Sequence, residues 1–272
     1  MLYTADQTAN IHEQQFAHLL VETTGNLFTI TLNRPEKKNA MSPLLMNELA
    51  YALTHATYNR NIWAVVIAAK GDVFCAGADL KAFAGEAQTI TSTIPQPADE
   101  VVLGNLFAGL HKPCIAKVQG PVYAGGFLII CGCTHVVAIE DATFSLPEVK
   151  RGIWPFQVMQ SLLQIMPPRQ MLDFCMRARS VNAQEAEKLG LVTKVVAKDK
   201  LDEEVQSLTD EIFQYSPSGI RLGLEAFDNL KNVAPGEAHK YLKQMLGEAL
   251  GTEDAAEGLM AFAQKRKPVW KG

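Results

Sequence analysis

The stretch Lys112-Pro113-Cys114-Ile115-Ala116-Lys117-Val118-Gln119-Gly120-Pro121-Val122-Tyr123-Ala124-Gly125-Gly126-Phe127-Leu128 decides the fold of this chain. Its first part, residues 114–119, is β-prone and lies between a proline and a glycine, which predicts a strand. Residues 120–124 predict a turn, and the unbroken apolar run from Gly125 to Cys133 predicts a buried helix. The sequence therefore predicts a strand–turn–helix unit of an α/β protein.

The turn could also bind a ligand through its backbone. Paired glycines at a helix start leave backbone N–H groups unpaired and pointing outward. Such groups can hold an anion, or an oxygen that becomes an anion during a reaction. A plain connection between a strand and a helix explains the same residues equally well, so this stretch alone does not assign a function.

Composition excludes several classes of partner. The chain has 272 residues, 48% of them hydrophobic and 20% charged, with a net charge of -4. It offers no basic field for nucleic acid or an anionic membrane surface. No run of 18 apolar residues predicts a membrane span. The polar N-terminal residues lack the pattern of a signal peptide, and we therefore expect a cytoplasmic protein.

Five cysteines, an odd number, lie in apolar surroundings, which is typical of reduced thiols in the cytoplasm. The segment Cys131-Gly132-Cys133-Thr134-His135 resembles a soft-metal cluster at first sight. Its spacing matches no usual zinc site, and no second Cys/His pair follows. We expect no metal site.

Periodicity and capping residues divide the chain into three parts: an N-terminal tail or first short element over 1–15, a β/α core over 16–200, and a helical region over 201–272. Before the deciding stretch we expect a hairpin (16–22 and 27–33), a helix starting at Ser42-Pro43 and ending near residue 58, a buried strand (63–69), a loop of small residues (71–81), a mobile loop or lid (84–97) and a helix (99–110). After it we expect a strand (135–139), two helices separated by Pro167-Pro168, a helix capped by Asn182, a strand (191–196) and four amphipathic helices, whose apolar faces need a surface that can belong to another subunit.

Glu148 is the notable carboxylate of the core. It follows a proline and lies between apolar residues. A carboxylate among apolar groups is disfavoured as an anion, which raises its pKa and suits proton transfer. A glutamate at a helix start, stabilised by the helix macrodipole, is the alternative interpretation.

Taken in order, these motifs make the chain similar to the enoyl-CoA hydratase/isomerase (crotonase) superfamily, over about residue 16 to the end. The matching pieces are Asn33-Arg34-Pro35 with Asn39-Ala40-Met41, Phe74-Cys75-Ala76-Gly77-Ala78-Asp79-Leu80-Lys81, Lys112 to Gly126, Phe144-Ser145-Leu146-Pro147-Glu148, Gly152, Ala186 to Val192, and Phe262 to Lys267. Each motif alone is weak, but their order and spacing are specific.

The resemblance implies an α/β fold, a crotonase-like spiral of ββα units with a helical C-terminal trimerisation region. It implies homotrimers, commonly paired into hexamers (a dimer of trimers). The substrate would be an acyl-CoA thioester, with no separate cofactor because coenzyme A is part of the substrate. By motif position, the peptide N–H groups of Ala78 and Gly125 would hold the thioester oxygen, and Glu148 would be the catalytic carboxylate.

The resemblance also suggests where coenzyme A would bind. It would lie along Ala40, Ala76 and Lys81, close to Gly126. Phe262 and Lys265, from a neighbouring subunit, would meet its adenine and phosphates; both lysines also suit ordinary solvated surface. Asp72 stands where many relatives carry a CoA-facing lysine, which puts part of the phosphate clamp in doubt. Bulky Trp154 and Phe156 stand where hydratases often have small residues, which indicates a reshaped acyl pocket, or ordinary helix packing.

One departure bears on the chemistry. Hydratases of this family use two glutamates around one water, and Leu128 stands at the position of the first. A single carboxylate is enough to move a proton from one carbon to another along an enolate. We therefore expect an isomerase that converts 3-enoyl-CoA to 2-enoyl-CoA. The alternatives are a hydratase with a non-standard second acid, a decarboxylase acting on a CoA or acyl-carrier-protein thioester, and a non-catalytic CoA-binding protein.

Overall fold

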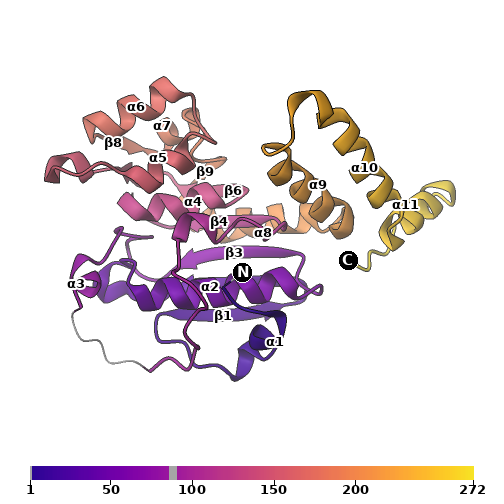
Figure 1. Cartoon of the computed structure of the whole chain (residues 1–272), viewed down its shortest axis with the longest axis horizontal. Coiled ribbons are helices and arrows are strands. Elements are labelled where there is room, and N and C mark those ends of the chain that lie inside the picture. Colours follow the sequence, from indigo (N-terminus) through magenta and orange to yellow (C-terminus); the bar gives the residue numbers. More distant parts are fainter. Residues whose placement is uncertain (1, 86–90) are drawn as a thin grey trace.

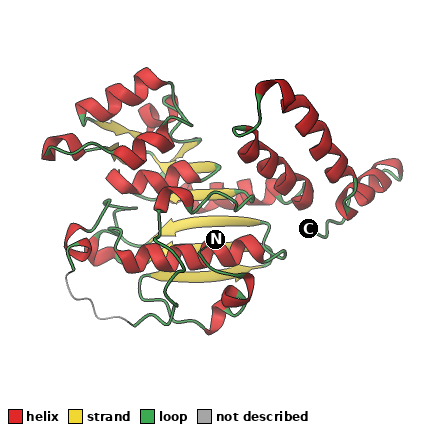
Figure 2. Cartoon of the chain, viewed as in Figure 1, coloured by secondary structure: helices red, strands yellow, loops and turns green. Residues whose placement is uncertain are grey.

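The computed structural model describes residues 2–85 and 91–272, and a six-stranded sheet runs through its core (Figures 1 and 2). The strands are β1 (Leu19–Thr24), β2 (Leu27–Leu32), β3 (Ala64–Ala69), β4 (Cys114–Val118), β6 (His135–Ile139) and β9 (Lys194–Val196). They lie in the order β1-β2-β3-β4-β6-β9, with β1 and β2 antiparallel and every other pair parallel. The predicted hairpin and the predicted strand of the deciding stretch are both confirmed.

A smaller second sheet joins β5 (Val122–Tyr123), β7 (Thr143–Ser145) and β8 (Ser180–Asn182) in the order β5-β7-β8. The sequence predicted none of these short strands. Two strands followed by helical structure recur along the chain, first as β1, β2 and α2, then as β4, β5 and α4. The α/β spiral of ββα units is therefore confirmed.

Eleven α-helices occur in the described residues: α1 (Ala5–Thr8), α2 (Pro43–Tyr58), α3 (Leu80–Phe83), α4 (Phe127–Gly132), α5 (Phe156–Leu162), α6 (Pro168–Arg177), α7 (Ala183–Lys188), α8 (Leu201–Ile212), α9 (Pro217–Leu230), α10 (Ala238–Leu250) and α11 (Glu253–Ala263). Helix α2 begins where the sequence predicted, because the Ser42 hydroxyl accepts a hydrogen bond from the Leu45 N–H and a proline occupies the first turn. Asn182 caps α7 in the same way.

The predicted helix over residues 99–110 is wrong. The described chain has only a 3-10 turn there, Leu103–Asn105. Gly104 lies within that turn, and Gly109 has a φ of +84°, in the left-handed region that ends helices. Residues 99–102 consequently lie outside any helix, and Glu100, Val101 and Val102 line a cavity.

The N-terminal residues are packed against the core, as a first short element. Tyr3 and Ile11 are buried, and the Tyr51 hydroxyl donates a 2.5 Å hydrogen bond to the Gln7 carbonyl. Part of the predicted lid, residues 86–90, lies outside the described residues. Its remainder is held in place, because the Asn47 amide donates to the Pro95 carbonyl at 3.0 Å.

The last helices stand apart from the sheets. Helix α8 packs near β4 and β6, whereas α9, α10 and α11 form a separate group at one side of the molecule (Figure 1). Within the described ranges, no helix combines the length and apolar character that crossing a bilayer requires.

Candidate active site

Two loops meet at the carboxyl ends of neighbouring parallel strands. One follows β3 and carries Ala78; the other follows β4 and carries Gly125. A bridge between Cys75 and Val122 joins them, and the Tyr123 N–H donates to the Cys75 carbonyl at 2.9 Å. This edge of an open α/β sheet is where ligands usually bind.

Small residues allow the two loops to approach each other closely. A Cβ atom built on Gly77 would lie only 2.6 Å from the Cβ of Ala124 and 3.3 Å from the nitrogen of Gly125. A Cβ built on Gly125 would lie 3.7 Å from the nitrogen of Ala78. Gly77 also has a φ of +90°, which a residue with a side chain rarely adopts. The backbone nitrogens of Ala78 and Gly125 are therefore neighbours.

The direction of the Ala78 peptide follows from its flanking hydrogen bonds. The Met41 N–H donates to the Gly77 carbonyl at 2.7 Å, and the Asp79 N–H donates to the Met41 carbonyl at 2.8 Å. Ala78, which lies between Gly77 and Asp79, is thus the partner of Met41 in a parallel bridge. In such a bridge the N–H of this middle residue points away from the partner strand. Among the described residues, neither the Ala78 nor the Gly125 N–H takes part in the backbone hydrogen bonds that join the loops. Both donors remain available.

Ala78 and Gly125 line one cavity of about 570 Å³ together with Glu148, Trp154 and Leu128. The cavity is within the size range of small-molecule sites, and most of its wall is apolar. The sequence-predicted catalytic residues are thus brought together from three separate segments of the chain.

Glu148 is partly buried, and it begins the 3-10 turn Glu148–Arg151 after β7. Burial raises the pKa of its carboxyl group, opposed by a hydrogen bond from its own backbone N–H and by the positive charge of Arg151. Its Oε2 is buried and has no hydrogen-bond partner in the described part of the chain. A buried carboxylate oxygen without a partner on a cavity wall is available to a substrate proton.

Leu128 lies in the first turn of α4 and is only 6% exposed. Its Cδ2 lies 3.6 Å from the position a Cβ would take on Gly104. The side chain is therefore packed into the cavity wall, at the position where the resemblance implies an acid in hydratases.

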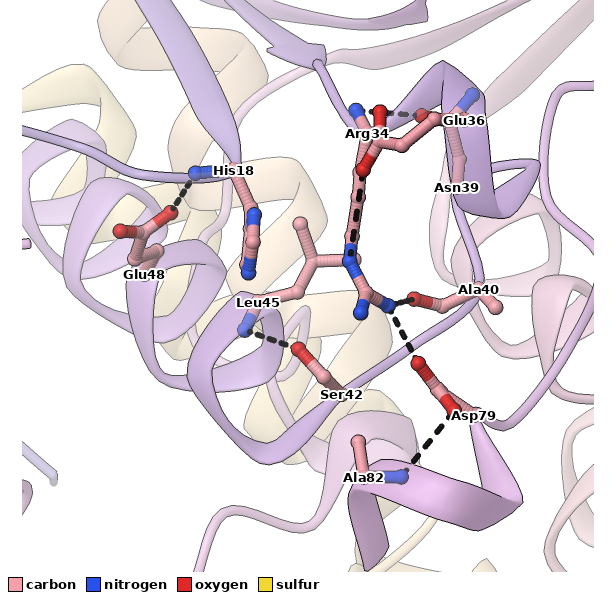
Figure 3. Close-up of polar contacts among 10 residues, drawn as sticks. All are labelled: His18, Arg34, Glu36, Asn39, Ala40, Ser42, Leu45, Glu48, Asp79 and Ala82. Carbon is pink, nitrogen blue, oxygen red and sulfur yellow. Dashed lines mark hydrogen bonds and ion pairs between the residues drawn. The ribbon is translucent and has the colours of Figure 1, made fainter. Parts of the chain in front are cut away.

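A buried polar network fixes the loop that carries Ala78 (Figure 3). The Arg34 guanidinium, 6% exposed, donates at 2.7 Å to the carboxylate of Asp79 and at 3.2 Å to the carbonyl of Ala40. The other oxygen of Asp79 accepts from the Ala82 N–H and caps α3. The Arg34 hydrogen bond holds the pKa of Asp79 below its usual range, with further help from the Ala82 N–H against the opposing effect of burial. Because Asp79 directly follows Ala78, these hydrogen bonds of Asp79 also fix the position of the Ala78 peptide.

Asn39 anchors the other end of the same network. This side chain is fully buried; its oxygen accepts from the Arg34 N–H, and its amide donates to the carbonyls of Lys70 and Val73. It therefore ties the loop that carries Arg34 to the end of β3. Neither Arg34 nor Asn39 was singled out for a role by the sequence.

The residues predicted to meet coenzyme A are distributed more widely. Ala40 and Ala76 lie on the two loops that the Arg34 network joins, and the Ala76 N–H donates to the Lys38 carbonyl at 3.0 Å. Lys81 is exposed on α3. Gly126 is buried, and a Cβ there would lie 2.9 Å from that of Cys75, so this glycine allows close packing.

Phe262 and Lys265 lie far from this cavity within their own chain. Phe262 is 87% exposed at the end of α11, on the opposite side of the molecule from α3 (Figure 1). Their expected contact with coenzyme A across a subunit boundary stays a prediction.

The sequence missed part of the cavity wall, namely Met46, Asn47, Phe83, Gln96, Glu100 and Val101, whereas Trp154 and Phe156 line the cavity as predicted. Glu100 and Val101 were hidden by the wrong helix prediction. One sequence signal was present: residues 82–110 contain no Lys, Arg or His, an unusually long stretch without positive charge.

Comparison with known proteins gives a consistent result. The family model described as "Enoyl-CoA hydratase/isomerase" matches residues 22–272. A "Probable enoyl-CoA hydratase" of Rhizobium meliloti (strain 1021) is 34% identical over 93% of this chain and 97% of its own length. A "Probable enoyl-CoA hydratase echA8" of Mycobacterium bovis is 33% identical over 92% of this chain and 96% of its own. The crystal structure of an enoyl-CoA hydratase from Bacillus anthracis superposes with a TM-score of 0.83 at 29% identity, covering 94% of this chain and all of that one.

Proposed function

Because this chain belongs to the enoyl-CoA hydratase/isomerase family of acyl-CoA enzymes, we propose that it moves a C=C bond, converting 3-enoyl-CoA to 2-enoyl-CoA. One observation carries the proposal. Glu148 shares its cavity with the Ala78 and Gly125 peptides, while apolar Leu128 fills the position of the first of the two hydratase glutamates. The site therefore holds the parts that enolate chemistry needs, without the pair of acids around a water.

The proposed reaction has two proton transfers. With the thioester oxygen between the N–H groups of Ala78 and Gly125, Glu148 removes a proton from C2, and the electron pair of that C–H bond enters the enolate. Protonation at C4 by the same carboxyl group then places the double bond between C2 and C3. The donors stabilise the charged enolate oxygen more than the neutral carbonyl, which lowers the barrier. Losing one such donor typically costs about 3–4 kcal/mol.

Coenzyme A binding and assembly complete the proposal. Ala40, Ala76, Lys81 and Gly126 would border the coenzyme A, and Trp154 the acyl chain. Phe262 and Lys265 of a neighbouring subunit would reach its adenine and phosphates in a homotrimer or hexamer. The exposed apolar residues of α9–α11 support such assembly. The five free cysteines support a cytoplasmic location.

The test uses two thioesters and one absorbance. Conjugation of the C=C bond with the thioester gives an ultraviolet band. With 3-hexenoyl-CoA the absorbance should rise, and with crotonyl-CoA it should stay constant or fall slowly. A rapid fall with crotonyl-CoA and no rise with 3-hexenoyl-CoA would replace the isomerase by a hydratase. No change with either, despite coenzyme A binding, would favour decarboxylation.

Hydration is the second candidate, since the relatives reported above are named as hydratases. Leu128→Glu separates the two functions. It would place an acid where the family's hydratases carry one, so we expect hydration of crotonyl-CoA to increase at least tenfold. Leu128→Gln, which adds polarity without an acid, is the matched control. If the wild type already hydrates rapidly and Leu128→Glu adds nothing, the isomerase assignment is wrong.

A further inference from the structure

The charged side chains that line the acyl cavity in the described part of the chain are all negative. Two carboxylates, Glu100 and Glu148, line it, and none of the described lining residues is Lys, Arg or His. The segments that build the wall agree with this: residues 82–110 and 152–168 contain no basic residue at all. The basic residues close in sequence to the wall, Lys81, Lys150 and Arg151, are absent from its lining, although the charge of Arg151 acts on Glu148.

Aromatic side chains accompany these carboxylates. Phe83 from the end of α3, Phe156 from the start of α5 and Trp154 line the same cavity, and the two phenylalanines are 52% and 69% exposed. The faces of aromatic rings carry negative electrostatic potential and attract cations, quaternary ammonium groups in particular. Neither an aromatic wall nor a carboxylate gives any stabilisation to a second carboxylate on a substrate.

We infer that this cavity selects acyl groups with a positively charged alkylammonium end and rejects acyl groups with a second carboxylate. The inference rests on the proposed function of the same cavity. Glu100 is the specificity-determining residue, because Glu148 is reserved for the proton transfer. An alkylammonium end gains attraction from Glu100 and the aromatic rings, whereas a carboxylate end meets Glu100 with no lining cation to offset the repulsion.

The experiment compares two matched pairs of 3-enoyl-CoA substrates. The first pair ends in trimethylammonium or in its neutral isostere, tert-butyl; the second ends in carboxylate or carboxamide. We expect kcat/KM to be roughly tenfold higher for trimethylammonium than for tert-butyl, and roughly tenfold lower for carboxylate than for carboxamide. Both ratios should shrink as salt is added, since Glu100 is exposed to solvent. Ratios near one in the wild type would overturn the inference.

Two neighbouring variants identify the responsible group. Glu100→Gln should bring the carboxylate-to-carboxamide ratio close to one. It should lower the trimethylammonium-to-tert-butyl ratio to the part that the aromatic rings supply, while leaving turnover of the tert-butyl substrate within about twofold. Asp99→Asn removes an adjacent carboxylate that does not line the cavity, and it should leave both ratios as in the wild type. Equal effects of the two variants would show a general surface field and remove Glu100 from the inference. A uniform loss with every substrate in Glu100→Gln would make Glu100 a catalytic acid, which also overturns the inference.

A binding measurement keeps this inference separate from the proposed reaction. Saturated acyl-CoA analogues with the same four ends cannot isomerise, and their dissociation constants report selection alone. If the charge ratios appear in binding but no double bond moves, the proposed function fails and the inference stands. If double bonds move in all four substrates without a charge preference, the inference fails and the proposed function stands.

Discussion

The core around the six-stranded sheet and the C-terminal helices α9 and α10 bury their apolar residues to very different extents. The core around the six-stranded sheet contains many fully buried side chains, such as Phe28, Ile115 and Phe127. The cluster between α9 and α10 has only three buried members, Leu222, Ala226 and Met245, each still 7–8% exposed. Large apolar side chains of the same helices remain in solvent, among them Phe227 at 75% and Leu246 at 59%.

This contrast separates two determinants of activity. The cavity and its polar network are built within the core, whose packing is complete in a single chain. The C-terminal helices carry the apolar surface that still lacks a partner in a single chain. Changes in the first region should affect chemistry and leave assembly intact, and changes in the second should affect assembly first.

The largest effect is expected at Glu148, the proposed catalytic carboxylate of the core. Glu148→Gln keeps the size of the side chain and removes the proton acceptor, so turnover should fall by about 10²–10⁴-fold. Coenzyme A affinity, measured by calorimetry, and the sedimentation coefficient should not change. In the wild type, kcat/KM should fall as the pH drops through a pKa that burial raises above the ordinary glutamate value. Turnover retained by Glu148→Gln would exclude Glu148 as the base.

The next effect concerns the Arg34–Asp79 network that holds the loop carrying Ala78. Arg34→Ala leaves the Asp79 carboxylate largely buried without its cation, and we expect a loss of about 3 kcal/mol in the free energy of unfolding, measured with urea. The kcat should fall as well, because the peptide of Ala78 is no longer held. Asp79→Asn in the Arg34→Ala background is the control: it keeps an acceptor for the Ala82 N–H and removes the carboxylate charge that Arg34→Ala leaves unpaired. A normal kcat in the Arg34→Ala protein would show that the network does not contribute to catalysis.

A smaller effect is expected on the C-terminal side of the comparison. Leu246→Glu puts a charge on the exposed apolar face of α10 and should weaken self-association by about 1.5–3 kcal/mol, the value of burying one leucine side chain. Analytical ultracentrifugation across a concentration series measures the change. Gln244→Glu adds the same charge at an exposed polar position of the same helix and should have little effect. Equal dissociation by both variants would indicate a charge effect and not an apolar contact.

The smallest effect is a dependence of core stability on acid. The pKa of Asp79 is lowered in the folded chain by the Arg34 hydrogen bond. The stabilisation from this group is therefore complete above its unfolded pKa of about 3.9 and is lost as the pH falls through the lower folded value. The free energy of unfolding should decline over this acidic range in the wild type and decline less in Asp79→Asn. Identical slopes for the two proteins would mean that the pair does not contribute.

The sequence predicted the large elements because their signals are local. Ser42 and Asn182 mark helix starts, because their side chains accept hydrogen bonds from the N–H group three residues further along the chain. Apolar runs mark the central strands. The strands of the second sheet are two or three residues long, too short for any periodicity. The position of Glu100 on the cavity wall depends on contacts between segments far apart in the chain, which no local pattern contains. The same holds for the partnership of Arg34 with Asp79, 45 residues away.

The close approach of Gly77 to Ala124 has a consequence for how new chemistry can arise on this scaffold. A Cβ added at Gly77 would lie 2.6 Å from the Cβ of Ala124, so this position has no room for even one added methyl group. Any substitution of Gly77 would therefore push apart the two loops that carry Ala78 and Gly125. Leu128 lies on the cavity wall outside this contact. We therefore expect new chemistry on this scaffold to arise through changes in the side chains of the wall, while Gly77 stays a glycine.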